Sequence, residues 1–311
     1  MRILVYGAGA VGGFFGGLLA HAGEDVRFVA RGAQREALQT SGLTIESRQR
    51  GTIVIPSVAV SDSAAAGGSV DLILVCVKTQ QMASILEDLA AAVGEQTVIV
   101  PLQNGVEADE QLAGRFPHAT VLPAVVYVGA TLDTPGTVSH VAAGTIGIGA
   151  RRERDNAVLP AVRDLLARTG QPIHISNDIQ RERWHKLMWN AAFNSVSAIT
   201  GRVPAELVSQ PDTRALVLAI MNEVLAVGRA CGVDLRQEDI DRHISWTEGA
   251  AGLRTSTMVD RERGRPMESD GLIGVIVRKG RGVGVPTPCS AVVYALLNAI
   301  DGGSGGSEPN L

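Results

Sequence analysis

The chain has few cysteines, no metal-ligand spacing and no long uninterrupted apolar run. Its three cysteines, Cys76, Cys231 and Cys289, are far apart and form no Cys-x-x-Cys pair. Neither a disulfide framework nor a zinc site is therefore indicated. The six histidines likewise lack a pattern such as H-E-x-x-H, and we expect no metal. No apolar stretch is long enough to cross a bilayer. Because the cysteines indicate no disulfide framework, a reducing cytoplasm is the simplest location.

A strong charge of either sign is also absent. The formal net charge is −4 and 19% of the residues are charged, so nothing suggests a nucleic acid or an anionic membrane as a partner. Aromatic residues make up only 4% of the chain, whereas glycine is abundant at 36 residues. A chain of 311 residues is long enough for two domains with ample cores.

The most specific pattern lies at the N-terminus. Residues 2–6 read as a buried strand, Gly7, Gly9 and Gly12 follow as G-x-G-x-x-G, and a helical pattern comes next. A lone G-x-G-x-x-G is weak evidence, but this order describes the first turn of a dinucleotide-binding fold. The phosphates would meet free N–H groups at the start of the helix. The expected contacts are Gly7, Gly9, Ala10, Val11 and Gly12.

The end of the next strand bears on the choice of cofactor. An NAD-binding fold usually places an acidic residue there to hold the ribose 2′-hydroxyl. This chain has Arg31 after a strand pattern over residues 24–30. A carboxylate would repel a 2′-phosphate, whereas a guanidinium attracts one. We therefore expect NADPH/NADP, the alternative being that Arg31 is an ordinary surface residue.

The two halves of the chain have different hydrophobic patterns. In the first, buried strand runs (72–77, 97–100, 121–127) alternate with helical stretches (81–92, 106–115), as in a parallel sheet. In the second, long helical patterns follow one another (179–197, 212–231, 237–248). The predicted fold class is α/β: an N-terminal Rossmann-type domain over residues 1–177, an all-α C-terminal domain over 178–301, and a flexible Gly/Ser tail over 302–311.

Polar residues follow two neighbouring strands of the predicted Rossmann domain. Lys78 and Gln81 come after one strand and Asn104 after the next. Ligands of such sheets bind at the carboxyl ends of the strands, so we take these three residues as candidate cofactor contacts. Both segments also read as ordinary turns, since Asn-Gly favours turns in any protein.

The second half contains a polar stripe within an apolar helix. Lys186, Asn190 and Asn194 are spaced i, i+4, i+8 and so share one face. Buried polar groups need partners or a cleft, although a solvent-facing stripe is an equally good interpretation. Further on, Glu268 follows a Gly-Arg-Pro turn. Taken alone, an acidic residue there is more often only a helix-dipole partner.

Together these motifs resemble the ketopantoate reductase (2-dehydropantoate 2-reductase) family over nearly the whole chain. The matching segments are G-A-G-A-V-G at the start, Arg31, V-K-T-Q-Q, Q-N-G, K-L-x-x-N-x-x-x-N, the T-S…D…G-R-P-x-E segment and G-V-P-T-P. Each is modest, but their order and spacing across two domains are specific.

The resemblance implies an NADPH-dependent reduction of 2-dehydropantoate to (R)-pantoate, on the way to pantothenate and coenzyme A. Lys186 resembles the general acid, and Glu268 a catalytic residue that also contacts the substrate. Burial would lower the pKa of Lys186 and Glu268 would raise it, and the sequence leaves open which effect is larger. The remaining assignments are Asn104, Asn190, Asn194 and Ser256 at the substrate, with Asn104 also near the cofactor.

Some residues beside the implied pocket depart from the usual family pattern. Ser195 follows Asn194 where proline is common, and Met267 and Ser269 flank Glu268. An alternative function is therefore the reduction of another 2-oxo acid by a paralogous enzyme. A non-catalytic NADP(H) sensor is a third hypothesis, disfavoured because Lys186 and Glu268 are both present. Monomer and homodimer both remain open.

Overall fold

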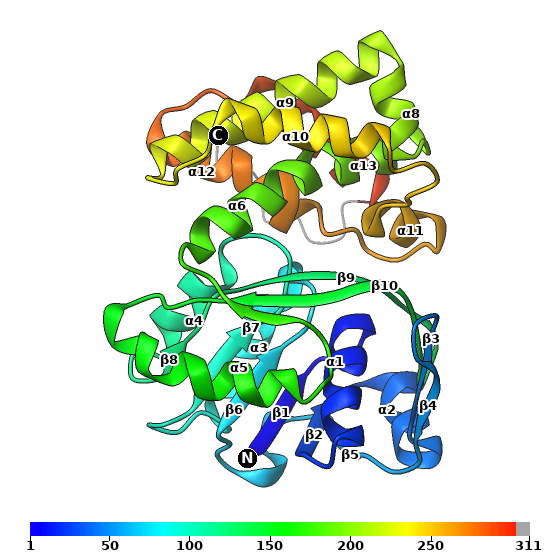
Figure 1. Ribbon diagram of the computed structural model, residues 1–311, viewed down its shortest axis with the longest axis vertical. Coiled ribbons are helices and arrows are strands. Elements are labelled where there is room, and N and C mark those ends of the chain that lie inside the picture. The colour runs from blue at the N-terminus through cyan, green and yellow to red at the C-terminus, as the bar shows by residue number, and fades with distance from the viewer. Residues whose placement is uncertain (303–311) are drawn as a thin grey trace. The chain divides into compact units, whose positions relative to one another are not determined.

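A computed structural model describes residues 1–302, so residues 303–311 of the expected tail lie outside the described part. The chain forms two compact units, the first spanning Met1–Ile179 and the second beginning at Gln180. Figure 1 shows the ribbon coloured from the N-terminus in blue to the C-terminus in red.

The first unit is built on a six-stranded, fully parallel sheet. The strand order is β5-β2-β1-β6-β7-β8. Its strands form where continuous Val/Ile/Leu runs can be buried on both faces: β1 (Arg2–Tyr6), β2 (Asp25–Val29), β5 (Ala59–Ser61), β6 (Leu72–Val75), β7 (Val98–Pro101) and β8 (Thr120–Val121). Because β6 crosses over to lie beside β1, the order reverses at β1, as in a Rossmann-type fold.

The first unit also contains a second sheet, which the sequence did not predict. It joins β11 (Ile173–Ile175), β10 (Thr137–Ile148), β3 (Leu43–Ser47) and β4 (Gly51–Ile55), with β9 (Ala124–Thr134) paired to β10. The apolar run over 121–127 is divided at Pro123 between β8 and β9, which belong to different sheets. Proline interrupts the run because it has no N–H to donate to a ladder.

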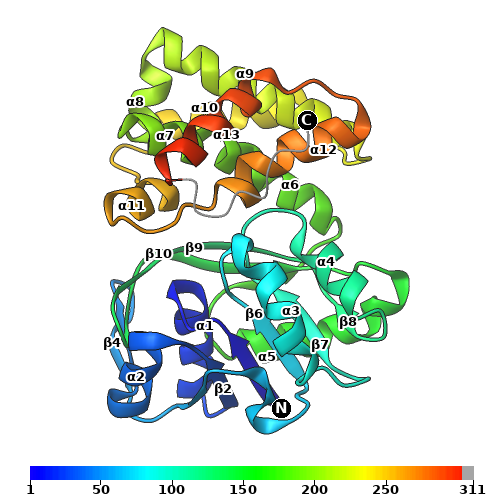
Figure 2. The same ribbon diagram turned by 180° about the vertical axis from the view of Figure 1, so that it is seen from behind.

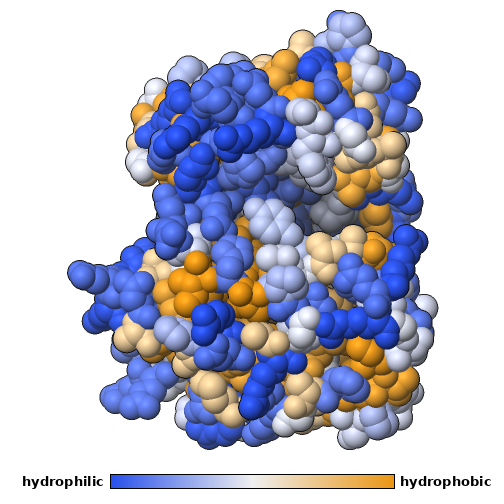
Figure 3. All heavy atoms as spheres, viewed as in Figure 1, coloured by the Kyte–Doolittle hydropathy of each residue, from blue (hydrophilic) through white to orange (hydrophobic). Residues whose placement is uncertain are grey.

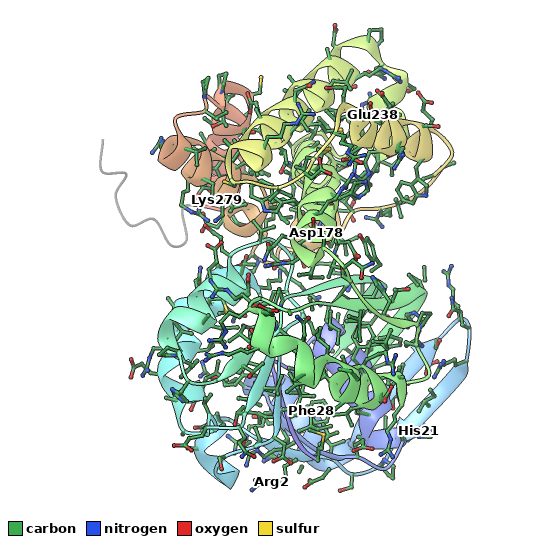
Figure 4. The ribbon with its side chains drawn as sticks, turned by 60° about the vertical axis from the view of Figure 1, so that its left-hand side comes forward. Arg2, His21, Phe28, Asp178, Glu238 and Lys279 are labelled. Atoms are coloured by element: carbon green, nitrogen blue, oxygen red, sulfur yellow. The ribbon has the colours of Figure 1, made fainter. Side chains whose placement is uncertain are left out.

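Helices cover the sheets on both sides. The glycine-rich helix α1 (Ala10–His21) contacts strands of both sheets, including β1, β3 and β10, and so packs between them. Figure 2, the view from behind, shows α3 (Met82–Ala90) in front of β6 and β7. The remaining helices are α2 (Gly32–Ser41), α4 (Ala108–Arg115) and α5 (Leu159–Ala167). Phe28 is fully buried within this unit (Figure 4).

Within the described residues of the second unit, all regular elements are helical. They are α6 (Ile179–Trp189), α7 (Ser195–Thr200), α8 (Pro204–Ser209), α9 (Pro211–Ala230), α10 (Gln237–Glu248), α11 (Ser256–Glu262), α12 (Val275–Val283) and α13 (Pro288–Ile300). On the face shown in Figure 3, hydrophilic residues cover much of this unit. The α/β class with a helical C-terminal region is thus confirmed.

One predicted helix is wrong in detail. The periodicity over 179–197 predicts a regular α-helix, but α6 and α7 are separated by a π-helical turn over Asn190–Asn194. A second π turn spans Asp270–Gly274, directly before α12, and contacts the first. A π turn inserts a residue into the helix and re-aims the side chains around it, and such turns occur mostly at functional sites.

Candidate active site

The turn between β1 and α1 is shaped by three glycines with different tasks. Gly7 has φ +100°, which side chains rarely tolerate. A Cβ on Gly12 would lie 2.0 Å from the Gly7 carbonyl oxygen, so only glycine permits this approach of helix and turn. A Cβ on Gly9 would meet nothing within 4 Å. The open side of the turn is therefore at Gly9.

That open side fits a pyrophosphate. Gly9 is the N-cap of α1 and no side chain caps the helix. The first N–H groups of a helix, here those of Ala10 and Val11, have no carbonyl partner within the helix. They and the helix dipole favour an anion at this position. The geometry of the turn therefore fits the diphosphate of a dinucleotide.

Arg31 lies just beyond the carboxyl end of β2, the neighbour of β1 in the sheet. It is exposed, and its extended backbone forms the N-cap of α2. No acidic residue occupies the strand end where a ribose hydroxyl would be held in an NAD-binding fold. An exposed guanidinium at this position fits a 2′-phosphate by charge and by bidentate geometry.

Lys78, Gln81 and Asn104 follow β6 and β7, which are adjacent in the sheet. The Lys78 backbone N–H donates to the Gln81 side-chain oxygen at 3.2 Å, which fixes this turn. Gln103, the first residue of the Q-N-G segment, donates from Nε2 to the Val77 carbonyl at 2.8 Å and so ties the two strand ends together. Two separate turns are thereby held at one edge of the sheet.

In the second unit, the polar stripe does not face solvent. Asn190 and Asn194 are only 7% and 2% exposed, and Lys186 is half-buried. Both asparagines belong to the first π turn, so the spacing that was read as a regular helical face is displaced by one extra residue. The sequence carries no signal for this insertion that we could identify.

Ser256 is brought to the same place by α11. The Thr255 side chain caps this helix by accepting from the Met258 N–H at 3.2 Å. Ser256, the first helical residue, accepts from Asn194 Nδ2 at 3.3 Å. The Asn194 side-chain oxygen, though buried, has no hydrogen-bond partner within the described part of the chain. A buried acceptor of this kind is costly unless a ligand or water satisfies it.

Lys186 and Glu268 form the charged part of this cluster. Glu268 lies directly before the helical turn that leads into the second π turn. Desolvation lowers the pKa of Lys186 to about 8, against the opposing effect of the Glu268 carboxylate, which raises it. Burial therefore outweighs the effect of the Glu268 charge on the pKa of Lys186, which decides the question that the sequence left open. Near pH 8 the amine exchanges a proton readily, as a general acid must.

Residues 1–302 lack the features of two other classes of site. Among these residues no group of three or more His, Cys, Asp or Glu side chains could hold a metal ion. Over the same range, no helix is long and apolar enough to cross a membrane.

A Rossmann-type sheet with a phosphate-binding turn, followed by helices that carry a lysine of lowered pKa among buried amides, defines a nicotinamide-dependent oxidoreductase. Comparison with known families agrees with this class. Residues 3–153 match the family "Ketopantoate reductase PanE/ApbA" and residues 178–301 match its C-terminal counterpart. The chain belongs to the ketopantoate reductase family.

Individual relatives are similar along their whole length. A 2-dehydropantoate 2-reductase of Mesorhizobium japonicum is 31% identical, with 96% of this chain and 98% of the relative covered. The crystal structure of a PanE/ApbA family ketopantoate reductase from Ralstonia eutropha superposes with a TM-score of 0.89 at 32% identity, covering 98% and 100% of the two chains. D-mandelate dehydrogenase with NADH and anilino(oxo)acetate shares the fold, with a TM-score of 0.89 at 23% identity and coverage of 97% and 99%.

Proposed function

We propose that this protein reduces 2-dehydropantoate to (R)-pantoate with NADPH. The observation that carries the proposal is Lys186, an amine with a pKa lowered to about 8, set among buried amide side chains. Family membership over both units supports the same reaction. We propose that residues 1–177 bind the cofactor and that residues 178–301 bind the substrate and supply the proton donor.

The chemistry assigns Lys186 the role of general acid. Bound NADPH supplies the hydride that reduces the ketone carbon. Negative charge then develops on the ketone oxygen, and the Lys186 ammonium stabilises that charge and donates the proton. Glu268 favours the charged form of Lys186. It therefore helps to keep Lys186 protonated, as a proton donor must be.

The neighbouring polar groups suit the substrate. Asn190 and Asn194 can orient it with donors and acceptors that add no charge. Ser256 offers a hydroxyl to the substrate carboxylate, and Glu268 can accept from the terminal hydroxyl. Asn104, which follows β7, is proposed to contact both substrate and nicotinamide.

For the cofactor, we propose that the turn of Gly7, Gly9, Ala10, Val11 and Gly12 holds the diphosphate. Arg31 binds the 2′-phosphate, and Lys78, Gln81 and Asn104 provide further contacts at the ends of β6 and β7. The open space at Gly9 and the absence of an acidic residue at the end of β2 support this arrangement.

The test is NADPH oxidation with 2-dehydropantoate beside a panel of other 2-oxo acids. We expect kcat/KM to be highest for 2-dehydropantoate by about a hundredfold, roughly 3 kcal/mol of transition-state discrimination. Equal or better turnover of another acid would overturn the substrate assignment. It would favour the second candidate, a paralogous 2-oxo acid reductase, which the departures from the family pattern at Ser195, Met267 and Ser269 also favour.

We also propose that the protein is a cytoplasmic homodimer with no nucleic-acid partner. One face of α13 exposes Val292 (61%), Leu296 (48%) and Ile300 (39%) at helical spacing, and the helix carries no charged residue. Such a face can meet its own copy about a two-fold axis without like-charge repulsion. Light scattering should give a dimer mass for the wild type and a monomer mass for Leu296→Glu, and a monomeric wild type would overturn this.

A further inference from the structure

The carboxyl ends of three adjacent strands carry polar side chains beside Arg31. In the order β5-β2-β1, Val29 of β2 pairs with Ser61 on one side and with Tyr6 on the other. Arg31 lies two residues beyond Val29. Ser63 likewise lies two residues beyond Ser61. The Arg31 guanidinium is therefore flanked by the strand that ends at Tyr6 and by the loop that contains Ser63.

A carboxylate from α3 joins these strand ends. The Tyr6 hydroxyl donates to Asp88 Oδ2 at 2.6 Å, and the Ala64 backbone N–H donates to the same oxygen at 3.0 Å. The Ser63 hydroxyl donates to Asp88 Oδ1. Three donors, one at the end of β1 and two in the segment of Ser63, thus fix the Asp88 carboxylate in one place and in its charged form, since hydrogen bonds to a carboxylate favour ionisation.

Arg31 influences both Tyr6 and Asp88. Its positive charge lowers the pKa of Asp88, and its charge and hydrogen bonding oppose the rise in the Tyr6 pKa that burial and Asp88 cause. Tyr6 is 2% exposed and its ring belongs to the core. The hydroxyl is therefore a rigid group beside an exposed guanidinium and a half-buried carboxylate.

We propose that Tyr6 and Asp88 are positioning residues that hold the Arg31 guanidinium at the sheet edge, ready for the 2′-phosphate of NADPH. This inference rests on the proposed use of NADPH and deepens it. A free arginine gives up much rotamer freedom when it binds a phosphate. A hydroxyl and a carboxylate fixed behind it reduce that loss, because the side chain is already ordered before binding.

The arrangement also accounts for how Arg31 is accommodated without the phosphate. A carboxylate behind the guanidinium balances its charge in the unbound state. That carboxylate already accepts three hydrogen bonds. It comes from α3 and not from the end of β2, where an acidic residue would hold a ribose hydroxyl. Asp88 therefore supports NADP binding and does not act as an NAD-type acid.

The test is calorimetric titration of the full chain with adenosine 2′,5′-bisphosphate and with AMP, which lacks the 2′-phosphate. Tyr6→Phe removes only the hydroxyl. It should weaken binding of the bisphosphate roughly tenfold, as expected for a hydrogen bond to a charged group, and leave AMP binding unchanged. In an Arg31→Ala background the same substitution should have no further effect. Unchanged bisphosphate binding by Tyr6→Phe would overturn the proposal.

A matched control is Tyr294→Phe, which also deletes a tyrosine–aspartate hydrogen bond, here to Asp270 in the second unit. It should bind both nucleotides as the wild type does. If Tyr6→Phe weakens AMP binding as well, Asp88→Asn is the deciding variant. It should lose affinity for the bisphosphate and keep its affinity for AMP. Wild-type affinity for the bisphosphate in Asp88→Asn would refute the positioning role. A wild type that binds the bisphosphate no better than AMP would instead refute the proposed NADPH preference.

Discussion

At the scale of single residues, the proposed chemistry depends on the environment of Lys186. Its pKa of about 8 is the result of desolvation, which lowers it, opposed by Glu268, which raises it. The sequence identified both residues by their order and spacing. It could not weigh the two effects, because burial depends on neighbours that are distant in the chain.

Glu268→Gln should therefore move the alkaline limit of turnover to lower pH. Loss of the carboxylate removes the attraction that stabilises the charged amine, so the pKa of Lys186 falls further. The pH at which kcat is half-maximal, measured by NADPH oxidation, should fall with it. Glu238→Gln, which neutralises an exposed glutamate on α10 (Figure 4), should leave that pH unchanged. An unmoved limit in Glu268→Gln would show that the carboxylate does not act on the lysine.

At the scale of elements, the turn before α1 shows how one motif contains separate physical requirements. Gly12 is needed for packing, since a Cβ there would collide with the Gly7 carbonyl, whereas Gly9 borders open space. The sequence predicted this turn well because strand, glycines and helix are contiguous. It missed the pairing of β9 with β10 and the two π turns, which depend on tertiary packing and not on local pattern.

Two alanine substitutions separate these requirements. Gly12→Ala should lower the thermal midpoint by about 5 °C, because overpacking costs about 2 kcal/mol. Gly9→Ala should keep the wild-type midpoint but raise the KM for NADPH roughly tenfold or more, since its methyl group takes the space of the diphosphate. Calorimetry and steady-state kinetics measure the two effects. Equal loss of stability in both variants would contradict the distinction.

At the scale of the whole molecule, the helical unit contains a half-buried network around His243 and His185 that responds to pH. The His243 ring donates to the His185 carbonyl at 2.9 Å and lies 4.1 Å from the His185 ring. Asp239 accepts from Arg181 at 3.1 Å with both oxygens. Desolvation and the neighbouring His185 lower the pKa of His243 to about 4, and desolvation also lowers the pKa of His185.

The second unit should therefore lose stability between pH 7 and pH 5. In this window the unfolded chain binds a proton at His243 that the folded chain does not, so the free energy of unfolding falls as the pH falls. The loss is about 2 kcal/mol, from about 1.5 pH units at 1.36 kcal/mol each. Asp239, whose pKa is lowered in the fold, contributes its loss only below the ordinary aspartate pKa, outside this window.

Urea unfolding followed by tryptophan fluorescence measures this effect in the second unit alone, because Trp184, Trp189 and Trp246 all belong to it. The wild-type midpoint should be lower at pH 5 than at pH 7, and His243→Gln should reduce the difference. Equal midpoints at the two pH values would show that His243 takes up its proton as readily in the fold as in the unfolded chain.

The most direct test of the account is the pH dependence of kcat for 2-dehydropantoate reduction with NADPH, measured for the wild type and for Lys186→Met. We expect a wild-type plateau below about pH 8 and a tenfold loss of kcat per pH unit above it, as the lysine loses its proton. The kcat of Lys186→Met should be lower by a factor of about 10²–10⁴ and should not fall in this way above pH 8. A variant with wild-type turnover, or a wild type without NADPH-dependent turnover, would contradict the account.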